Sequence, residues 1–346
     1  MTNIENLINK DQSIWLDSIS NQMIESGDLK NLISNGISGI TSNPSIFEKA
    51  ISSSDSYDKK ILKLSETYTS SKEIFEIIAT DDIRNAADLL SHVYENSYQN
   101  DGFVSLEVDP HLANDSEKTI IEAEKLWAKV DRKNLMIKIP GTEDGIYATK
   151  QLLENGINVN ITLLFSFENY KKTLEAFIES KNKNKNSKSV ASFFISRIDT
   201  AVDNIIDSKN PLFHKMAIIN AFRAYDLFLS KKEKMGNNFQ KLLWASTSVK
   251  AKELNQEYYT YNLPLKNTIN TLPLETIDYL LKSKILTSNN LEINDNFKDM
   301  YESSKNQFDF EKITNSLLLN GIKLFQESYD SLLDTIDQKI SKLINK

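Results

Sequence analysis

Eight short segments rich in β-branched and aromatic residues alternate along the chain with longer segments of helical character. This alternation is typical of βα units on a parallel sheet, and eight units are the number that closes a (β/α)8 barrel. A chain of 346 residues is long enough for one such barrel with additional helices. We therefore predict an α/β protein, a (β/α)8 TIM barrel forming a single domain over residues 1–346. The predicted strands are residues 13–17, 39–43, 103–108, 135–139, 157–163, 189–194, 241–246 and 268–272.

The segments between these strands carry helix signals. Residues 114–130 begin with capping and acidic residues, and residues 143–156 end at Gly156, a residue suited to the position after a helix. Residues 57–100 leave room for two helices between the second and third strands. From about residue 309 the sequence is amphipathic, with apolar residues at helical spacing, and we expect a helix packed on the outside of the barrel.

The composition argues against several classes of function. A formal net charge of -7 is unfavourable for general nucleic-acid binding, which needs a basic surface. With no cysteine the chain has no disulfide and no thiolate nucleophile. The three histidines lack zinc-site spacing, and the nine glycines form neither a dinucleotide-binding nor a P-loop motif. We expect no metal and no organic cofactor, so side chains must do the chemistry.

The amino-terminal residues and the hydropathy pattern give no sign of a membrane partner. The first residues, MTNIENLINKDQS, lack a basic stretch followed by an apolar one, and no run approaches the ~18 apolar residues of a membrane span. We therefore expect a soluble cytoplasmic protein without a membrane partner.

Polar side chains recur near the carboxyl ends of the predicted strands, on one face. In INVNITLL, Asn158, Asn160 and Thr162 share a face, and the apolar residues occupy the other. Catalytic residues of barrel enzymes project from the carboxyl ends of several strands, so we expect the polar face to line the barrel interior. The expected inward set contains Asp17, Asn43, Glu107, Lys138, Asn160, Thr162, Ser192, Phe194, Trp244 and Ser246.

Lys138 stands out because it interrupts the apolar run NLMIKIPG. Burial disfavours a charged ammonium group, and a free amine in an enclosed pocket is a nucleophile for carbonyl compounds. Asp17 and Glu107 would supply the proton carriers that Schiff-base formation needs. These residue types together indicate a class I aldolase-type mechanism. Arg197 and Lys250, after the sixth and seventh strands, would lie where barrel enzymes often bind phosphate.

Each of these residues also has a structural interpretation when taken alone. Lys138 could be a lysine paired with a carboxylate, and Glu107 could be half of a structural ion pair. Asp17 could cap the following helix, and Asn43 could start a turn before Pro44. Polar residues at the ends of seven strands favour the catalytic interpretation of the whole set.

Eight motifs in the right order, spread over nearly the whole chain, resemble the transaldolase family, in particular its longer bacterial subgroup. They are QSIWLDSI, GITSNPSIFEKAI, DGFVSLEVDPHLAND, LMIKIPGTEDG, INVNITLLFSFENY, SVASFFISRIDTAVD, LLWASTSVK and NTINTLPLETI. The resemblance implies a (β/α)8 barrel that transfers a dihydroxyacetone unit between sugar phosphates in the pentose phosphate pathway, without metal or organic cofactor. A homo-oligomer is compatible with the resemblance.

The resemblance also implies a role for each matching residue. Lys138 would form the Schiff base, Asp17 would exchange the proton of the C4 hydroxyl, and Glu107 with Thr162 would shuttle protons through a water. The three-carbon unit would be held by Asn43, Asn160 and Ser192, in a pocket shaped by Phe194. The phosphate would be bound by Arg197, Ser246 and Lys250.

The chain departs from the family pattern after the seventh strand and at one histidine. It reads STSVKAK where the subgroup usually reads STGVKNP, and His111 stands where arginine is common. Two alternatives stay open. The first is a fructose-6-phosphate aldolase of the same superfamily, although such aldolases carry a tyrosine in the role of Glu107. The second is a catalytically silent barrel that binds sugar phosphates.

Overall fold

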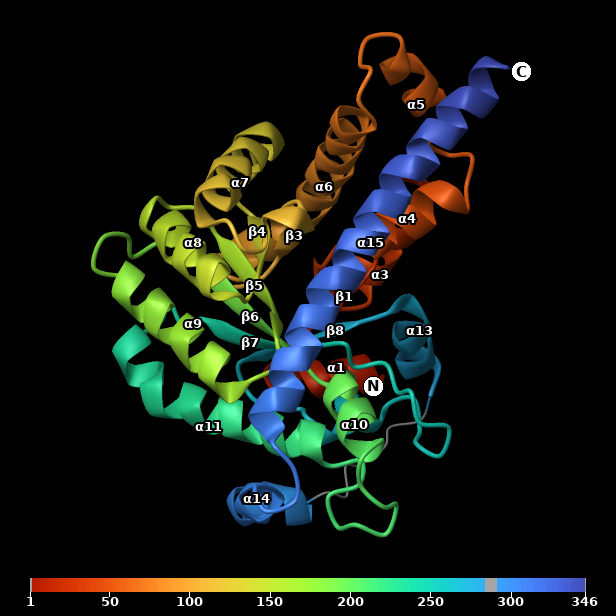
Figure 1. Ribbon diagram of the computed structural model, residues 1–346. Helices are drawn as coiled ribbons and strands as arrows, with labels where there is room; N and C mark the ends of the chain where they lie inside the picture. Colours follow the sequence, from red (N-terminus) through yellow and green to blue (C-terminus); the bar gives the residue numbers. More distant parts are fainter. Residues whose placement is uncertain (1, 284–290, 346) are drawn as a thin grey trace.

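A closed barrel of eight parallel strands, in sequential order from β1 to β8, forms the centre of the molecule (Figure 1). The structure is a computed structural model that describes residues 2–283 and 291–345. The predicted (β/α)8 barrel is confirmed. The strands are β1 Gln12–Leu16, β2 Ile37–Ile40, β3 Val104–Glu107, β4 Leu135–Pro140, β5 Val159–Leu164, β6 Ser189–Phe194, β7 Lys241–Ala245 and β8 Thr268–Leu272.

Helices cover the outside of the barrel and one of its ends. They are α1 Asn3–Ile8, α2 Asn21–Glu25, α3 Asp28–Ser34, α4 Pro44–Ser52, α5 Asp58–Ser65, α6 Ser71–Asn96, α7 Ser116–Val130, α8 Glu143–Glu154, α9 Phe167–Ser180, α10 Ser196–Asp203, α11 Met216–Met235, α12 Tyr258–Asn262, α13 Leu274–Lys282, α14 Leu291–Ser304 and α15 Phe310–Ile344, with a 3-10 turn η1 at Pro110–Leu112. None of the helices in these described ranges is long and apolar enough to cross a membrane.

Each predicted strand overlaps one observed strand, and the largest offset is at β2. That strand ends at Ile40, because Asn43 and Pro44 start α4 with Asn43 as its N-cap. The two helices expected within residues 57–100 are α5 and α6.

Near its amino end the barrel interior is filled by the large side chain of Trp15, which packs against Gly39. Trp15 of β1 is fully buried, and a Cβ at Gly39 of β2 would lie 2.4 Å from the Trp15 ring. Only glycine therefore fits at position 39. The Trp15 Nε1 group donates to Asp101 Oδ1 at 2.8 Å, which satisfies the indole N–H.

Trp244 of β7 does not face the interior, so the inward placement expected for it is wrong. It pairs in register with Phe193, and their rings lie 6.4 Å apart; Phe193 in turn contacts Tyr170 of the outer helix α9. β7 ends at Ala245, and Ser246 has φ of 53°, which breaks the alternation of faces. Ala245 and Ser246 consequently both border the interior cavity.

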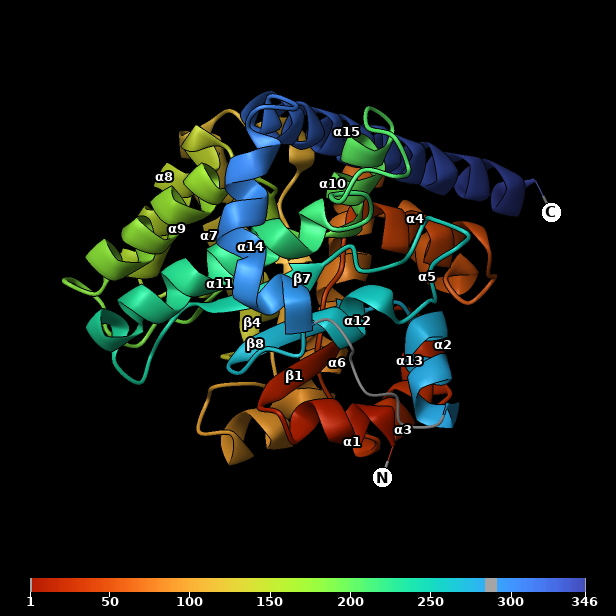
Figure 2. The same cartoon turned by 90° about the horizontal axis from the view of Figure 1, so that it is seen from below.

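The carboxy-terminal helix α15 packs on the helices around the barrel and also lies across the carboxyl end of the barrel, a position that its amphipathic pattern does not specify. Figures 1 and 2 show it crossing one end of the barrel and continuing past α4 toward α5. It packs against α4, α5, α6 and α10, and it also touches β5. Its buried side chains include Phe325, Leu332 and Ile336.

Candidate active site

A cavity of about 200 Å³ opens at the carboxyl end of the barrel beneath α15. Most of the predicted site residues line it, and two others, Glu107 and Asn160, lie outside its lining. The predicted residues on its wall are Asp17, Asn43, Lys138, Thr162, Ser192, Phe194, Arg197, Ser246 and Lys250.

Lys138 is held in the interior by two defined contacts. Its side chain is 5% exposed, and its Nζ donates to the Ser42 carbonyl oxygen at 2.9 Å and to Glu107 Oε2 at 3.0 Å. β3 and β4 place Glu107 beside Lys138 in register, and β4 and β5 place Asn160 beside Lys138 on the other side. The amine is therefore fixed in position at the cavity wall.

Glu107 is more deeply enclosed than an ordinary carboxylate. Its side chain is 3% exposed, and burial raises its pKa, with the nearby charge of Asp17 adding to the effect and Lys138 opposing it. Its Oε1 atom has no hydrogen-bond partner among the described residues. A carboxylate with a raised pKa can accept the proton of the adjacent ammonium group, and this transfer leaves both groups neutral.

Asp17 follows β1 directly and is oriented by hydroxyl groups from two neighbouring strands. Thr41 Oγ1 donates to Asp17 Oδ1 at 2.6 Å, and Thr41 and Thr271 share a hydrogen bond of 2.7 Å. Asp17 does not cap the next helix, because Ser20 accepts from Met23 N as the N-cap of α2. Its carboxylate is therefore available to the cavity.

Asn43 serves the fold and the cavity at once. Its Oδ1 accepts from Ile46 N at 3.0 Å as the N-cap of α4, so the structural interpretation of the Asn-Pro pair is correct. The same side chain borders the cavity, where its amide NH₂ group can still donate.

Asn160, Ser192 and Ser105 form a buried hydrogen-bond chain below the cavity. Ser192 Oγ donates to Asn160 Oδ1 at 2.7 Å, and Asn160 Nδ2 donates to Ser105 Oγ at 3.0 Å. Asn160 is fully buried and so fixes the Ser192 hydroxyl, which does border the cavity. On the adjacent wall, Thr162 Oγ1 is buried and has no hydrogen-bond partner in the described part of the chain.

The side of the cavity formed by the ends of β6 and β7 is cationic. Arg197, in the first turn of α10, has its guanidinium carbon 5.6 Å from the Phe194 ring centroid, and burial lowers its pKa. Its Nη1 atom is buried without a partner among residues 2–283 and 291–345. Ser196 N donates to the Ser246 carbonyl at 2.9 Å, and this bond joins the start of α10 to the loop that carries Lys250. Two cations and a helix amino terminus favour an anion here.

Several residues that contribute to the cavity were missing from the sequence-based set. Thr271 lies on β8, the one strand without a predicted polar end, and Ser248 lies in the irregular loop after β7. Phe325 comes from α15, and its ring centroid is 5.4 Å from Lys138 Nζ. Alternation does not identify Thr271, because the polar residues Thr268 and Asn270 lie on the other face of β8. No local signal identifies Phe325.

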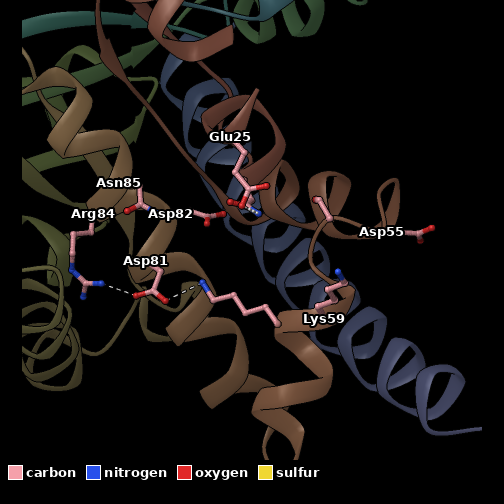
Figure 3. A pocket seen from close by; sticks show the side chains of 10 residues that line it. Glu25, Asp55, Lys59, Asp81, Asp82, Arg84 and Asn85 are labelled. Atoms are coloured by element: carbon pink, nitrogen blue, oxygen red, sulfur yellow. Dashed lines mark hydrogen bonds and ion pairs between the residues drawn. The ribbon is translucent and has the colours of Figure 1, made fainter. Parts of the chain in front are cut away.

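A larger cavity of about 720 Å³ lies between α2, the start of α5 and α6, away from the barrel mouth (Figure 3). Three of its charged side chains pair with one another: Asp81 bonds Arg84 at 2.6 Å and Lys60 at 2.9 Å. Asp82 accepts from Tyr57 Oη at 2.7 Å. Among the described residues on its wall, the lysines Lys59 and Lys60 are not buried as Lys138 is, so size alone does not make this cavity the candidate site.

Comparison with known proteins gives a consistent result over the whole chain. Residues 14–336 match the transaldolase/fructose-6-phosphate aldolase family. A transaldolase from Trichodesmium erythraeum is 39% identical over 98% of this chain and 97% of its own length. A second relative, called transaldolase 2, from Streptomyces coelicolor, is 36% identical over 98% of both chains. Similarity of this extent includes every strand of the barrel and the helix that covers its mouth.

Proposed function

The chain belongs to the transaldolase/fructose-6-phosphate aldolase family, and from this premise we propose that it transfers a dihydroxyacetone unit from a ketose phosphate to an aldose phosphate through a Schiff base on Lys138. The observation that carries the proposal is the position of the Lys138 amine. Lys138 lies on the wall of a cavity that Asp17 also lines, and its Nζ bonds the buried Glu107 carboxylate behind this wall at 3.0 Å. The donor would be fructose 6-phosphate or sedoheptulose 7-phosphate. The acceptor would be glyceraldehyde 3-phosphate or erythrose 4-phosphate.

The first step is attack of the amine on the ketose carbonyl. Glu107 accepts a proton from Lys138 and so produces the neutral amine. The same proton then goes to the carbinolamine hydroxyl, which leaves as water when the Schiff base forms. Thr162 would bind the water that relays this proton. Its buried Oγ1, which has no hydrogen-bond partner among the described residues, supports this role. The buried Oε1 of Glu107, which also lacks a partner within the described ranges, supports the relay.

The second step is cleavage of the C3–C4 bond. Asp17 takes the proton of the C4 hydroxyl, the aldose phosphate leaves with a new carbonyl, and the bond electrons pass into the iminium to give an enamine. The hydrogen bond from Thr41 to Asp17 Oδ1 at 2.6 Å supports this role, because it fixes the carboxylate and leaves Oδ2 for substrate. In the reverse direction Asp17 returns the proton to the acceptor.

Substrate binding divides between the two sides of the cavity. Asn43 and Ser192 would bind the hydroxyls of the three-carbon unit, with Asn160 holding Ser192 in place and Phe194 shaping the wall. Arg197, Ser246 and Lys250 would bind the phosphate. The bond between the start of α10 and the Ser246 carbonyl supports this grouping, because it holds the two loops together despite the altered STSVKAK sequence.

A transfer assay tests the proposal. The protein is incubated with fructose 6-phosphate and erythrose 4-phosphate, and sedoheptulose 7-phosphate and glyceraldehyde 3-phosphate are measured. We expect equal amounts of the two products, and none with Lys138→Met. Lys181→Met is the matched control, because Lys181 is also partly buried and burial lowers its pKa to about 8. Formation of glyceraldehyde 3-phosphate with free dihydroxyacetone, and no seven-carbon sugar, would favour the aldolase alternative. No product with any ketose phosphate would favour the silent barrel.

A further inference from the structure

Phe325 of α15 covers the cavity directly above the reacting amine. Its ring is 5% exposed, borders the same cavity as Lys138, and has its centroid 5.4 Å from Lys138 Nζ. Together with Phe194 and Ala245, the ring forms the apolar part of a largely polar cavity wall. It comes from the carboxy-terminal helix, whereas those two residues lie on barrel strands.

A close contact one helical turn earlier lets α15 approach the barrel. A Cβ added at Gly321 would lie 3.0 Å from Leu163 Cδ2, which is tighter than side chains normally pack. Leu163 follows Thr162 in β5 and has φ of 57°, at an irregularity in the pairing of β5 with β6. Gly321 and Phe325 are four residues apart and share a helix face, so this approach places Phe325 over the cavity.

Further contacts hold this stretch of α15 against the elements that follow the neighbouring strands β2 and β3. Gln326 Nε2 donates to the Pro110 carbonyl at 3.3 Å, in the loop that follows Glu107. His111 Nε2 lies 3.5 Å from Asp330 Oδ1, and Ser328 bonds Ser45 of α4 at 2.7 Å. Phe325 therefore belongs to a segment fixed against two of the elements that build the site.

An apolar cover matters because the enamine left after C3–C4 cleavage can react in two ways. Its nucleophilic carbon can form a C–C bond to an acceptor aldehyde, which completes transfer. It can instead form a C–H bond with a proton from water, and the resulting iminium then adds the hydroxide, so that free dihydroxyacetone leaves and the Lys138 amine is restored. The second route consumes one water and transfers nothing, so water access decides between them.

Resting on the proposed function above, we propose that Phe325 is a specificity-determining residue that keeps water from the enamine carbon and so favours transfer over release. Its ring face also attracts the positive charge of the iminium, which adds to retention of the intermediate. The family contains both transaldolases and aldolases. In this chain, the proposal attributes part of the preference for transfer over release to a helix outside the barrel strands.

The test measures the ratio of free dihydroxyacetone to sedoheptulose 7-phosphate, with fructose 6-phosphate and excess erythrose 4-phosphate. We expect Phe325→Ala to raise this ratio about tenfold or more. Phe325→Leu, which keeps an apolar cover, should raise it less. Phe310→Ala is the matched control, since Phe310 lies on the same helix and is 6% exposed but does not border the Lys138 cavity. We expect its ratio to equal that of the unchanged protein.

The outcomes separate this inference from the proposed function. If the unchanged protein gives no borohydride-stable adduct on Lys138, the proposed function itself is wrong. If it forms the adduct and transfers, but Phe325→Ala and Phe325→Leu leave the ratio unchanged, the role of Phe325 is wrong. An equal rise of the ratio in Phe310→Ala would likewise contradict the role of Phe325, because any disturbance of α15 would then be sufficient to increase release. If Phe325→Ala does not fold, Phe325→Leu decides alone. Its ratio of free dihydroxyacetone to sedoheptulose 7-phosphate must then exceed the ratio of Phe310→Ala.

Discussion

Glu76 and Glu107 both have buried side chains that bond lysine ammonium groups, and their pKa values move in opposite directions. Glu76 of α6 is 8% exposed and bonds both Lys125 and Lys129 of α7. Burial favours its neutral form, but the hydrogen bonds and charges of the two lysines outweigh burial and lower its pKa. The Glu107 side chain is 3% exposed and, among the described residues, bonds only Lys138; burial prevails, so its pKa is raised.

The difference separates an ion pair with a structural role from the pair to which we assign a proton transfer. With two partly exposed lysines bonded to it, the charged form of Glu76 is stabilised. With one buried lysine and the Asp17 charge nearby, the ionised form of Glu107 is less favoured and a proton can move from Lys138 to it. The number of counter-charges and their exposure decide between the two outcomes, although both sites consist of carboxylate and ammonium groups.

The largest expected effect comes from removing the lysine at each site. Lys138→Met should lower turnover at least about 10⁴-fold, because no other side chain replaces the covalent nucleophile. The raised pKa of Glu107 lets it take a proton and stay buried, so the protein should remain folded. Lys125→Met should leave turnover unchanged, because Lys129 still bonds Glu76. Steady-state kinetics with circular dichroism measures both. Similar loss in the two variants would contradict the comparison.

Asp17→Asn should separate the two chemical steps. We expect Schiff-base formation to persist while C3–C4 cleavage slows about 10³-fold, because only cleavage needs the Asp17 carboxylate as base. The variant also removes a charge that raises the pKa of Glu107. Rapid-quench reduction followed by mass spectrometry distinguishes six-carbon from three-carbon adducts. Equal slowing of both steps would show that the role of Asp17 is misassigned. The control for structural disturbance is Asp101→Asn, because the Asp101 carboxylate also bonds β1, through Trp15, but does not line the cavity.

The two carboxylates can be compared directly by the same substitution. Glu107→Gln should slow adduct formation about 100-fold, because the amide cannot take the proton from Lys138. Glu76→Gln should leave adduct formation unchanged and lower the free energy of unfolding by about 1 kcal/mol, since its lysines are half exposed. Adduct formation is followed by stopped reduction, and stability by urea unfolding. A rate defect in Glu76→Gln would remove the distinction between the sites.

The opposite pKa directions also predict opposite pH dependences of stability. Glu76 has a lowered pKa, so the stability it contributes is present above the unfolded value of ~4.3 and is lost as pH falls through its folded pKa. Glu107 has a raised pKa, so the folded state gains stability as pH falls toward ~4.3. Urea unfolding of the two glutamine variants against the unchanged protein, from pH 7 down to well below ~4.3, measures both slopes. Slopes of the same sign would contradict the account.

The smallest expected effect concerns the hydroxyl chain that orients Asp17. Thr271→Val removes the partner of Thr41 and should lower the rate of cleavage about threefold to tenfold, the equivalent of one hydrogen bond. Thr173→Val, at a fully buried threonine whose hydroxyl has no partner among the described residues, is the matched control. Kinetics of the half-reaction with fructose 6-phosphate measures the effect. Equal rates for the two variants would show that the chain does not position Asp17.

Much of the barrel could be predicted from the sequence, because strand patterns and helix caps are local. Alternation within INVNITLL assigned Thr162 to the interior, and the structure lines the cavity with it. Alternation failed at Trp244, because the left-handed backbone of Ser246 breaks it and no residue type there signals the break. Asn43 could not be assigned to one role, because it both caps α4 and borders the cavity.

Contacts between elements distant in sequence could not be predicted in this way. The amphipathic pattern of residues 310–344 correctly indicates a helix, but it does not say which surface the apolar face covers. Phe325 reaches Lys138 only because α15 crosses the mouth of the barrel, and Gly321 permits the approach. Likewise the pKa of Glu107 depends on how closely three strands enclose it, which residue spacing does not specify.

The central claim is that Lys138 is the nucleophile, and borohydride trapping tests it most directly. The protein is incubated with fructose 6-phosphate, reduced, digested, and the added mass is located by peptide mapping. The account predicts a three-carbon adduct on the peptide that contains Lys138, discharged when erythrose 4-phosphate is added before reduction. An adduct on another lysine, such as Lys181, or no adduct with any ketose phosphate, would contradict it.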